Sequence, residues 1–143
     1  MYRPDFAVYI TLGLLMRLIF SLALLTIAPL AAAYDTERAK DNLAHEATAC
    51  SAYFMLVSAL PGVDEATSNK ARQQFSNLLN FSVTLSNEKI TKARFELAQK
   101  SMFRDLDGKG SNVAIVSNKY VIPCVDLVND PEARLKYWLG KTD

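Results

Sequence analysis

The feature that most constrains the fold is a stretch without charge, Ala49–Leu60, which runs for twelve residues and contains Cys50, one of two cysteines. A helix that is apolar on every side must contact other elements on several sides. We therefore expect this stretch to form part of a central buried helix. The remaining segments should pack around it.

A second apolar region lies at the amino terminus. From Phe6 to Ala33 the only charged residue is Arg17. Read from Met16, the region has the basic start, apolar middle and alanine-rich end of a secretory signal peptide. We expect residues 1–33 to be a signal peptide that is cleaved after Ala33, which leaves residues 34–143 as the mature domain.

Two alternatives concern this segment. Met16 is an alternative translation start, because Arg17 interrupts the apolar run of a signal peptide that begins at Met1. If the segment is not cleaved, the product is a membrane-anchored helical protein, since the region exceeds the roughly 20 residues that span a bilayer. A charge in the middle of a span costs about 2.5 kcal/mol or more, which favours cleavage.

Both cysteines, Cys50 and Cys124, lie in the mature domain. An exported chain meets an oxidising compartment, where an even number of thiols normally pairs, so two buried free thiols are the less favoured alternative. We expect a Cys50–Cys124 disulfide and a periplasmic or secreted location. Export without a further anchor predicts no membrane association after cleavage.

Hydrophobic periodicity and capping residues predict an all-α fold. We expect one antiparallel bundle of four main helices and a short C-terminal helix, joined by one disulfide and preceded by the signal peptide. The expected helices run from about Thr36 to Leu60, from about Asp64, from a cap at Asn87, over residues 112–129, and from Pro131 to a stop at Gly140.

The same periodicity predicts which faces point inward. In the first helix the apolar stripe includes Phe54, which we expect at the centre of the core. In the third helix the apolar stripe consists of Ile90, Ala93 and Leu97, followed by either Ser101 or Met102. Three phenylalanines fall partly off these stripes and are candidates for a partner or ligand surface: Phe81, Phe95 and Phe103.

Charge and motifs exclude several classes of function. The chain has 16 basic and 15 acidic residues, of which two and one lie in residues 1–33, so the mature domain is formally neutral. A neutral domain lacks the basic surface that binds phosphate backbones, so we expect no nucleic acid partner.

Metal and catalytic signatures are also incomplete. The single histidine, His45, has Ala49 where a helical zinc motif needs a second histidine. In the acidic loop that begins at Asp105, Lys109 and Val116 occupy positions where a calcium loop carries oxygen ligands. We therefore expect no enzyme activity, no cofactor, and no catalytic, cofactor-binding or metal-binding residues.

By elimination, the leading hypothesis is a small exported interaction protein, such as an enzyme inhibitor, immunity factor or accessory subunit. Its partner would be another protein of the cell envelope. The alternative is a carrier that encloses a small apolar ligand, because the chain has more aromatic residues than a short bundle needs. An exposed apolar patch would favour the first hypothesis and an internal cavity the second.

The first prediction concerns processing. The exported product should begin at Tyr34, because the small residues Ala31 and Ala33 precede that position as in signal peptidase substrates. Intact-mass measurement of secreted or periplasmic material checks this. A product that retains Met1 or Met16 would contradict it and support the membrane-anchored alternative.

Overall fold

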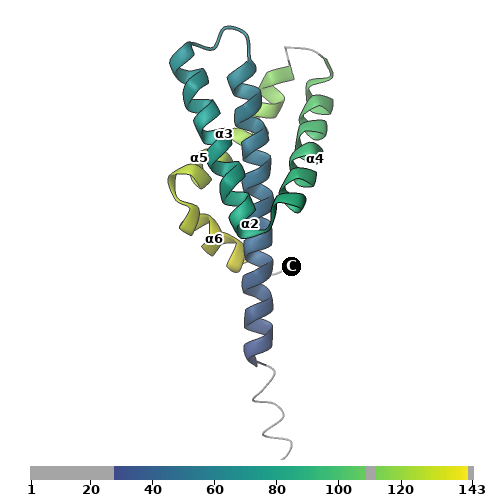
Figure 1. The fold of residues 1–143 in the computed structure, drawn as a ribbon, viewed down its shortest axis with the longest axis vertical. Helices are drawn as coiled ribbons and strands as arrows, with labels where there is room; N and C mark the ends of the chain where they lie inside the picture. The colour runs from purple at the N-terminus through teal and green to yellow at the C-terminus, as the bar shows by residue number, and fades with distance from the viewer. Residues whose placement is uncertain (1–27, 109–111, 142–143) are drawn as a thin grey trace, which may run out of the picture. The chain divides into compact units, whose positions relative to one another are not determined.

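The computed structural model describes residues 28–108 and 112–141, with side chains from Thr36 onward. The four longer helices alternate in direction (Figure 1), and all secondary structure in the described part is helical. The helices are α2 (Ala28–Ala59), α3 (Glu65–Leu85), α4 (Glu88–Leu106), α5 (Val113–Asn129) and α6 (Pro131–Leu139). The predicted all-α bundle of four main helices and a short closing helix is confirmed.

The chain divides into two compact units, Met1–Thr36 and Glu37–Asp143, and the helical bundle is the second. The predicted signal peptide falls mostly on residues 1–27, outside the described part. Helix α2 begins at Ala28, earlier than the predicted start near Thr36. The expected start was that of the cleaved chain, whereas in the uncleaved chain the helix includes Pro29 in its first turn, where proline is well tolerated.

Three helices are capped by side chains, and the predicted caps at Asn87 and Asp130 are among them. The side chains of Asp64, Asn87 and Asp130 accept hydrogen bonds from backbone N–H groups in the first turns of α3, α4 and α6, each at 2.9 Å. Thr67 donates to Asp64 through both its backbone and its hydroxyl, and these bonds lower the pKa of Asp64. Each cap satisfies a backbone donor that a helix otherwise leaves free.

Helix α5 confirms the helix expected over residues 112–129. Pro123 lies within it, and the helix continues from Val113 to Asn129 without a restart. Proline removes one backbone hydrogen bond, and packing of the buried face of α5, which includes Val116, Cys124 and Leu127, holds the helix on both sides of it.

The core is built around α2, whose buried residues are mostly small. Ala44, Ala47, Thr48 and Ser51 are fully buried on this helix. Small side chains let neighbouring helix backbones come close, so polar groups of one helix can reach the backbone of the next. The central position predicted for this helix is confirmed.

Hydroxyl groups join α2 to α3 along most of their contact. From α3, Ser82 donates to the carbonyl of Ala44 at 2.9 Å. In the reverse direction, Ser51 donates to the carbonyl of Phe75 at 2.9 Å. Near the turn between the helices, Ser68 donates to the carbonyl of Ser58 at 2.8 Å.

The buried hydroxyl of Ser82 also links α2 to α4. Its oxygen lies 2.7 Å from the Thr48 hydroxyl and 3.2 Å from the Thr91 hydroxyl. Thr91 lies in turn 3.2 Å from the hydroxyl of Ser86, which precedes α4. Buried polar groups are costly without partners, so this network fixes how the three helices meet.

The disulfide between Cys50 and Cys124 is present, with a Cα–Cα distance of 5.2 Å. It joins α2 to α5, and both residues are almost completely buried. The bond closes a loop of 74 residues. In the chain-entropy model such a loop stabilises the fold by about 4 kcal/mol.

The predicted inward face of α4 is wrong except at Met102, which is buried. Leu97 is 62% exposed and Ile90 is 39% exposed, whereas Thr91, which was not predicted, is buried. The helix is rotated so that Thr91 reaches the Ser82 hydroxyl. A search for apolar periodicity misses this, because the residue that sets the rotation is polar.

Phe54 also differs from the prediction. It is only partly buried at the edge of the core, while its neighbour Tyr53 is 5% exposed. The Tyr53 ring stacks on Tyr120 of α5 with 6.0 Å between centroids. The aromatic centre of the α2–α5 contact is therefore Tyr53, which sequence analysis assigned to the opposite face.

The second prediction tests the hydroxyl network. Ser82→Ala should lower the free energy of unfolding by about 1–3 kcal/mol, because it removes bonds to Ala44, Thr48 and Thr91 inside the core. The matched control is Ser76→Ala on the exposed face of α3, which should change it by less than about 0.5 kcal/mol. Urea unfolding compares the two, and equal effects would contradict a structural role for the network.

Candidate functional site

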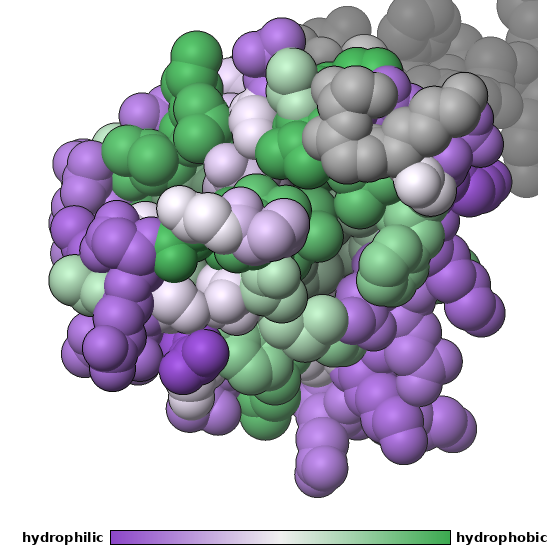
Figure 2. Space-filling model, turned by 90° about the horizontal axis from the view of Figure 1, so that it is seen from above, coloured by the Kyte–Doolittle hydropathy of each residue, from purple (hydrophilic) through white to green (hydrophobic). Residues whose placement is uncertain are grey.

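An apolar groove lies between the C-terminal halves of α2 and α4. It has a volume of about 230 Å³. Figure 2, seen from above relative to Figure 1, shows apolar side chains gathered on this end of the molecule and polar side chains around them. We call the groove between these two helices the α2–α4 groove. The residues that line it are Ala52, Met55, Leu56, Ser58, Ala59, Gln99, Met102, Phe103 and Leu106.

The groove exists because α3 and α4 lie close at one end and apart at the other (Figure 1). They are held together near the turn at Ser86, where the hydroxyl network lies. Farther along, the rings of Phe75 and Phe95 meet with 5.8 Å between centroids. Beyond this pair, Met55 of α2 lines the groove together with residues of α4.

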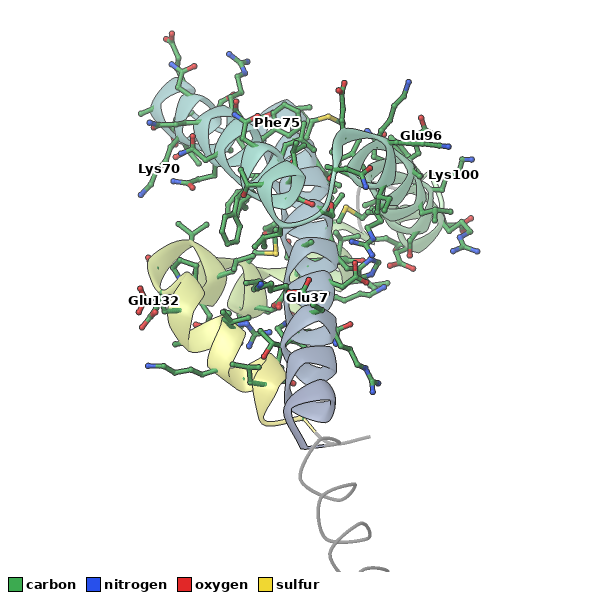
Figure 3. The ribbon with its side chains drawn as sticks, turned by 60° about the horizontal axis from the view of Figure 1, so that its bottom comes forward. Glu37, Lys70, Phe75, Glu96, Lys100 and Glu132 are labelled. Atoms are coloured by element: carbon green, nitrogen blue, oxygen red, sulfur yellow. A yellow bond between two sulfur atoms is a disulfide. The ribbon has the colours of Figure 1, made fainter. Side chains whose placement is uncertain are left out.

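Phe75 marks the inner end of this region. In Figure 3 its side chain lies between α3 and α2, whereas Glu96 and Lys100 extend outward from α4. The side-chain amide of Gln99 lies 3.7 Å from the sulfur of Met55 and contributes a polar group to the groove. Methionine adapts readily to differently shaped apolar partners.

The outer edge of the groove is formed by Phe103, which is 62% exposed. Phe103 also contributes to a shallow depression on the outside of α4, together with Leu97, Lys100 and Arg104. An exposed phenylalanine and an exposed leucine on one helix surface are unusual for a monomer when they lie next to a groove. Lys100 and Arg104 give this edge two positive charges.

A second apolar groove, of about 240 Å³, lies on another side of α2. It is bounded by α2, α3 and α5 and includes Phe54, Ala71 and Val125. Lys70 and Gln74 of α3 also line it. Both grooves are partly open to solvent.

The three phenylalanines predicted as a surface have different environments. Phe103 lines the α2–α4 groove and is exposed. Phe95 is partly buried and pairs with Phe75 at the inner end. Phe81 is partly buried against the core and lines neither groove.

Several residues of the groove were not predicted. Met55 and Leu56 lie within the uncharged stretch that indicated the central helix, so their composition indicated burial rather than a surface. Gln99 and Leu106 carried no signal as candidates. Their position follows from the rotation of α4, which the apolar pattern did not reveal.

A separate polar cluster holds α6 against α2. Glu46 accepts hydrogen bonds from the guanidinium of Arg134 and, at 2.7 Å, from the indole N–H of Trp138. Arg134 also lies over the ring of Tyr137 at 4.4 Å. Both oxygens of the Glu46 carboxylate are used in these contacts, so the cluster is suited to anchoring a short helix.

Other sequence candidates remain separate in the structure. His45 is exposed on α2. Asp105 forms an ion pair with Lys119 at 3.1 Å, and this bond raises the pKa of Lys119. Within the described ranges, no cluster of three histidine, cysteine or acidic residues could hold a metal ion.

Comparison of the chain with protein-family models, with curated proteins and with solved structures found no match. Among the helices described, none is long and apolar enough to span a membrane.

The third prediction compares the stability effect of a phenylalanine that packs against the core with that of one at the edge of the groove. Phe95→Ala should lower the free energy of unfolding by about 2–3 kcal/mol, because the ring packs against Phe75 and the core. Phe103→Ala should change it by less than about 0.5 kcal/mol, because Phe103 is mostly exposed. Thermal or urea unfolding checks both, and a strongly destabilised Phe103→Ala variant would contradict the groove described here.

Proposed function

We propose that this chain is a small exported helical protein that binds another protein of the cell envelope through the α2–α4 groove. The observation that carries the proposal is the exposed Phe103 beside an open apolar groove. Apolar surface of this kind is costly in water and is typical of interaction sites. The proposed activity is binding, as in an inhibitor, immunity factor or accessory subunit.

The disulfide supports a periplasmic or secreted location. Cys50 and Cys124 are paired and buried, and such structural disulfides persist in oxidising compartments. This fits a periplasmic or secreted protein that has lost its signal peptide. If residues 1–33 were retained, the product would be a membrane-anchored helical protein.

The size of the groove favours a protein partner over an enclosed small ligand. Ligand pockets usually measure about 300–1,000 Å³ and bury most of the ligand. The α2–α4 groove measures about 230 Å³ and is partly open to solvent. It is large enough to take one or two apolar side chains from a partner.

The chemistry of the edge indicates what the partner should present. Met55, Leu56 and Met102 offer an apolar, adaptable surface, and Gln99 offers a single amide. Lys100 and Arg104 stand on the outer edge beside Phe103. A partner segment with an apolar anchor and adjacent acidic residues would complement this arrangement.

The fourth prediction tests the groove in cells. A photoreactive phenylalanine analogue at position 103 should crosslink to one envelope protein of defined mass, because this side chain borders the groove. The matched control carries the analogue at Leu139, which is 44% exposed on α6, away from the groove. We expect a specific product only at position 103.

The same crosslink should disappear when Leu56→Asp introduces a charge into the groove, provided that circular dichroism shows the variant to be folded. Equal crosslinking from positions 103 and 139 would contradict the proposal. An apolar small molecule that co-purifies with the protein and blocks the crosslink would favour the carrier alternative instead.

A further inference from the structure

The outer face of α5 is apolar and exposed, although the inner face of the same helix forms part of the core. Val116, Cys124 and Leu127 are buried on the inner face. The exposed apolar residues are Ile115 at 54%, Val121 at 41%, Ile122 at 67% and Val125 at 44%. A helix that is apolar on both faces is normally covered on both.

These exposed residues follow the spacing of a helix-pairing surface. Ile115 and Ile122 are seven residues apart, and Val125 follows Ile122 by three. This is the a-to-a and a-to-d spacing of a heptad repeat, which places the three side chains in one seam along the helix. The d position between the two isoleucines is Asn118, so the apolar part of the seam is densest at Ile122 and Val125. Both sides of Pro123 belong to one helix.

The charges beside this seam are also seven residues apart and have opposite signs. Lys119 and Asp126 each come four residues after an isoleucine of the seam, so both lie along the same edge. If two copies of α5 pair antiparallel about a two-fold axis between positions 122 and 123, position 119 of one copy lies opposite position 126 of the other. The axis generates this contact twice.

We propose that this chain associates with a second copy of itself through an antiparallel pairing of the two α5 helices. Ile122 and Val125 of the two copies meet beside the axis and form the centre of the apolar seam, and Ile115 lies at its end, near the end of the partner's α5. Lys119 of each copy faces Asp126 of the other. Charges at the edges of paired helices determine orientation and partner choice, and the opposite signs here favour the antiparallel arrangement of identical chains.

The ion pair between Lys119 and Asp105 is compatible with this pairing. The Lys119 side chain remains 51% exposed while it contacts Asp105 at 3.1 Å. An ammonium group has three donors, so it can bind one carboxylate in its own chain and another across the interface. Asp105 would then help to position Lys119 at the edge of the seam.

The expected dimer is weak. One pair of short helices buries less than the roughly 800 Å² per partner of a standard interface, so we expect a dissociation constant above about 1 μM. The α2–α4 groove is not part of the seam. Self-association and partner binding can therefore succeed or fail independently.

Analytical ultracentrifugation of the purified protein over a wide concentration range tests the proposal. The wild-type chain should show a reversible monomer–dimer equilibrium. Ile122→Asp should abolish it, because it places a charge at the centre of the seam. The matched control, Leu139→Asp on α6, should dimerise like the wild type, since Leu139 is similarly apolar and 44% exposed but outside the seam.

Charge reversal tests the orientation. Asp126→Lys and Lys119→Asp should each weaken self-association by about tenfold, because each creates two like-charge contacts across the axis. An equimolar mixture of the two variants should recover association, since one chain then carries lysine at both positions and the other aspartate. Thermal unfolding of each variant confirms that its monomer is folded.

A wild-type protein that remains monomeric at several hundred micromolar would overturn the proposal. Dimers that persist in Ile122→Asp would place the interface elsewhere and overturn it as well. A mixture of the charge-reversed variants that associates no better than either alone would refute the antiparallel register.

Discussion

The close approach of α2 and α3 is the constraint on which the rest of the bundle depends. Hydroxyl groups of Ser51, Ser68 and Ser82 each reach a backbone carbonyl of the facing helix at 2.8–2.9 Å. A serine side chain is short, so these bonds form only if the two helices lie nearly in contact. Fully buried alanines such as Ala44 and Ala47 on α2 make that possible.

This constraint also explains where the candidate site lies. The network around Ser82 and Thr91 draws α4 onto α2 and α3 beside the α3–α4 turn, and the Phe75–Phe95 contact continues the packing along the helices. Past that contact α3 and α4 diverge (Figure 1), and Met55 on α2 borders a groove rather than a sealed core. The disulfide at Cys50 fixes α5 to α2, so this exposed surface has a rigid support.

Local signals in the sequence were sufficient to predict the helices, but not to predict which face of each helix points inward. Asn87 and Asp130 are caps whose effect depends only on the next few residues, and both were predicted. The rotation of α4 was not predicted, because Thr91 turns inward to reach Ser82, a residue on another helix. Apolar periodicity assumes that buried residues are apolar, and it fails where a buried contact is polar. Phe103 was identified because it departs from that periodicity, whereas Met55 resembles any core residue.

The polar core and the apolar surface are two consequences of one arrangement. Where Thr48, Ser82 and Thr91 occupy the interior of the α2–α3–α4 junction, the apolar residues of α4 that would otherwise fill it are left outside. Leu97 is 62% exposed because Thr91 is buried. Hydrogen bonds within the junction specify a single packing, while the apolar side chains outside it remain available to contact another protein. The hydroxyl groups therefore give this fold its specificity, and the apolar side chains that they displace form the exposed surface through which we propose binding.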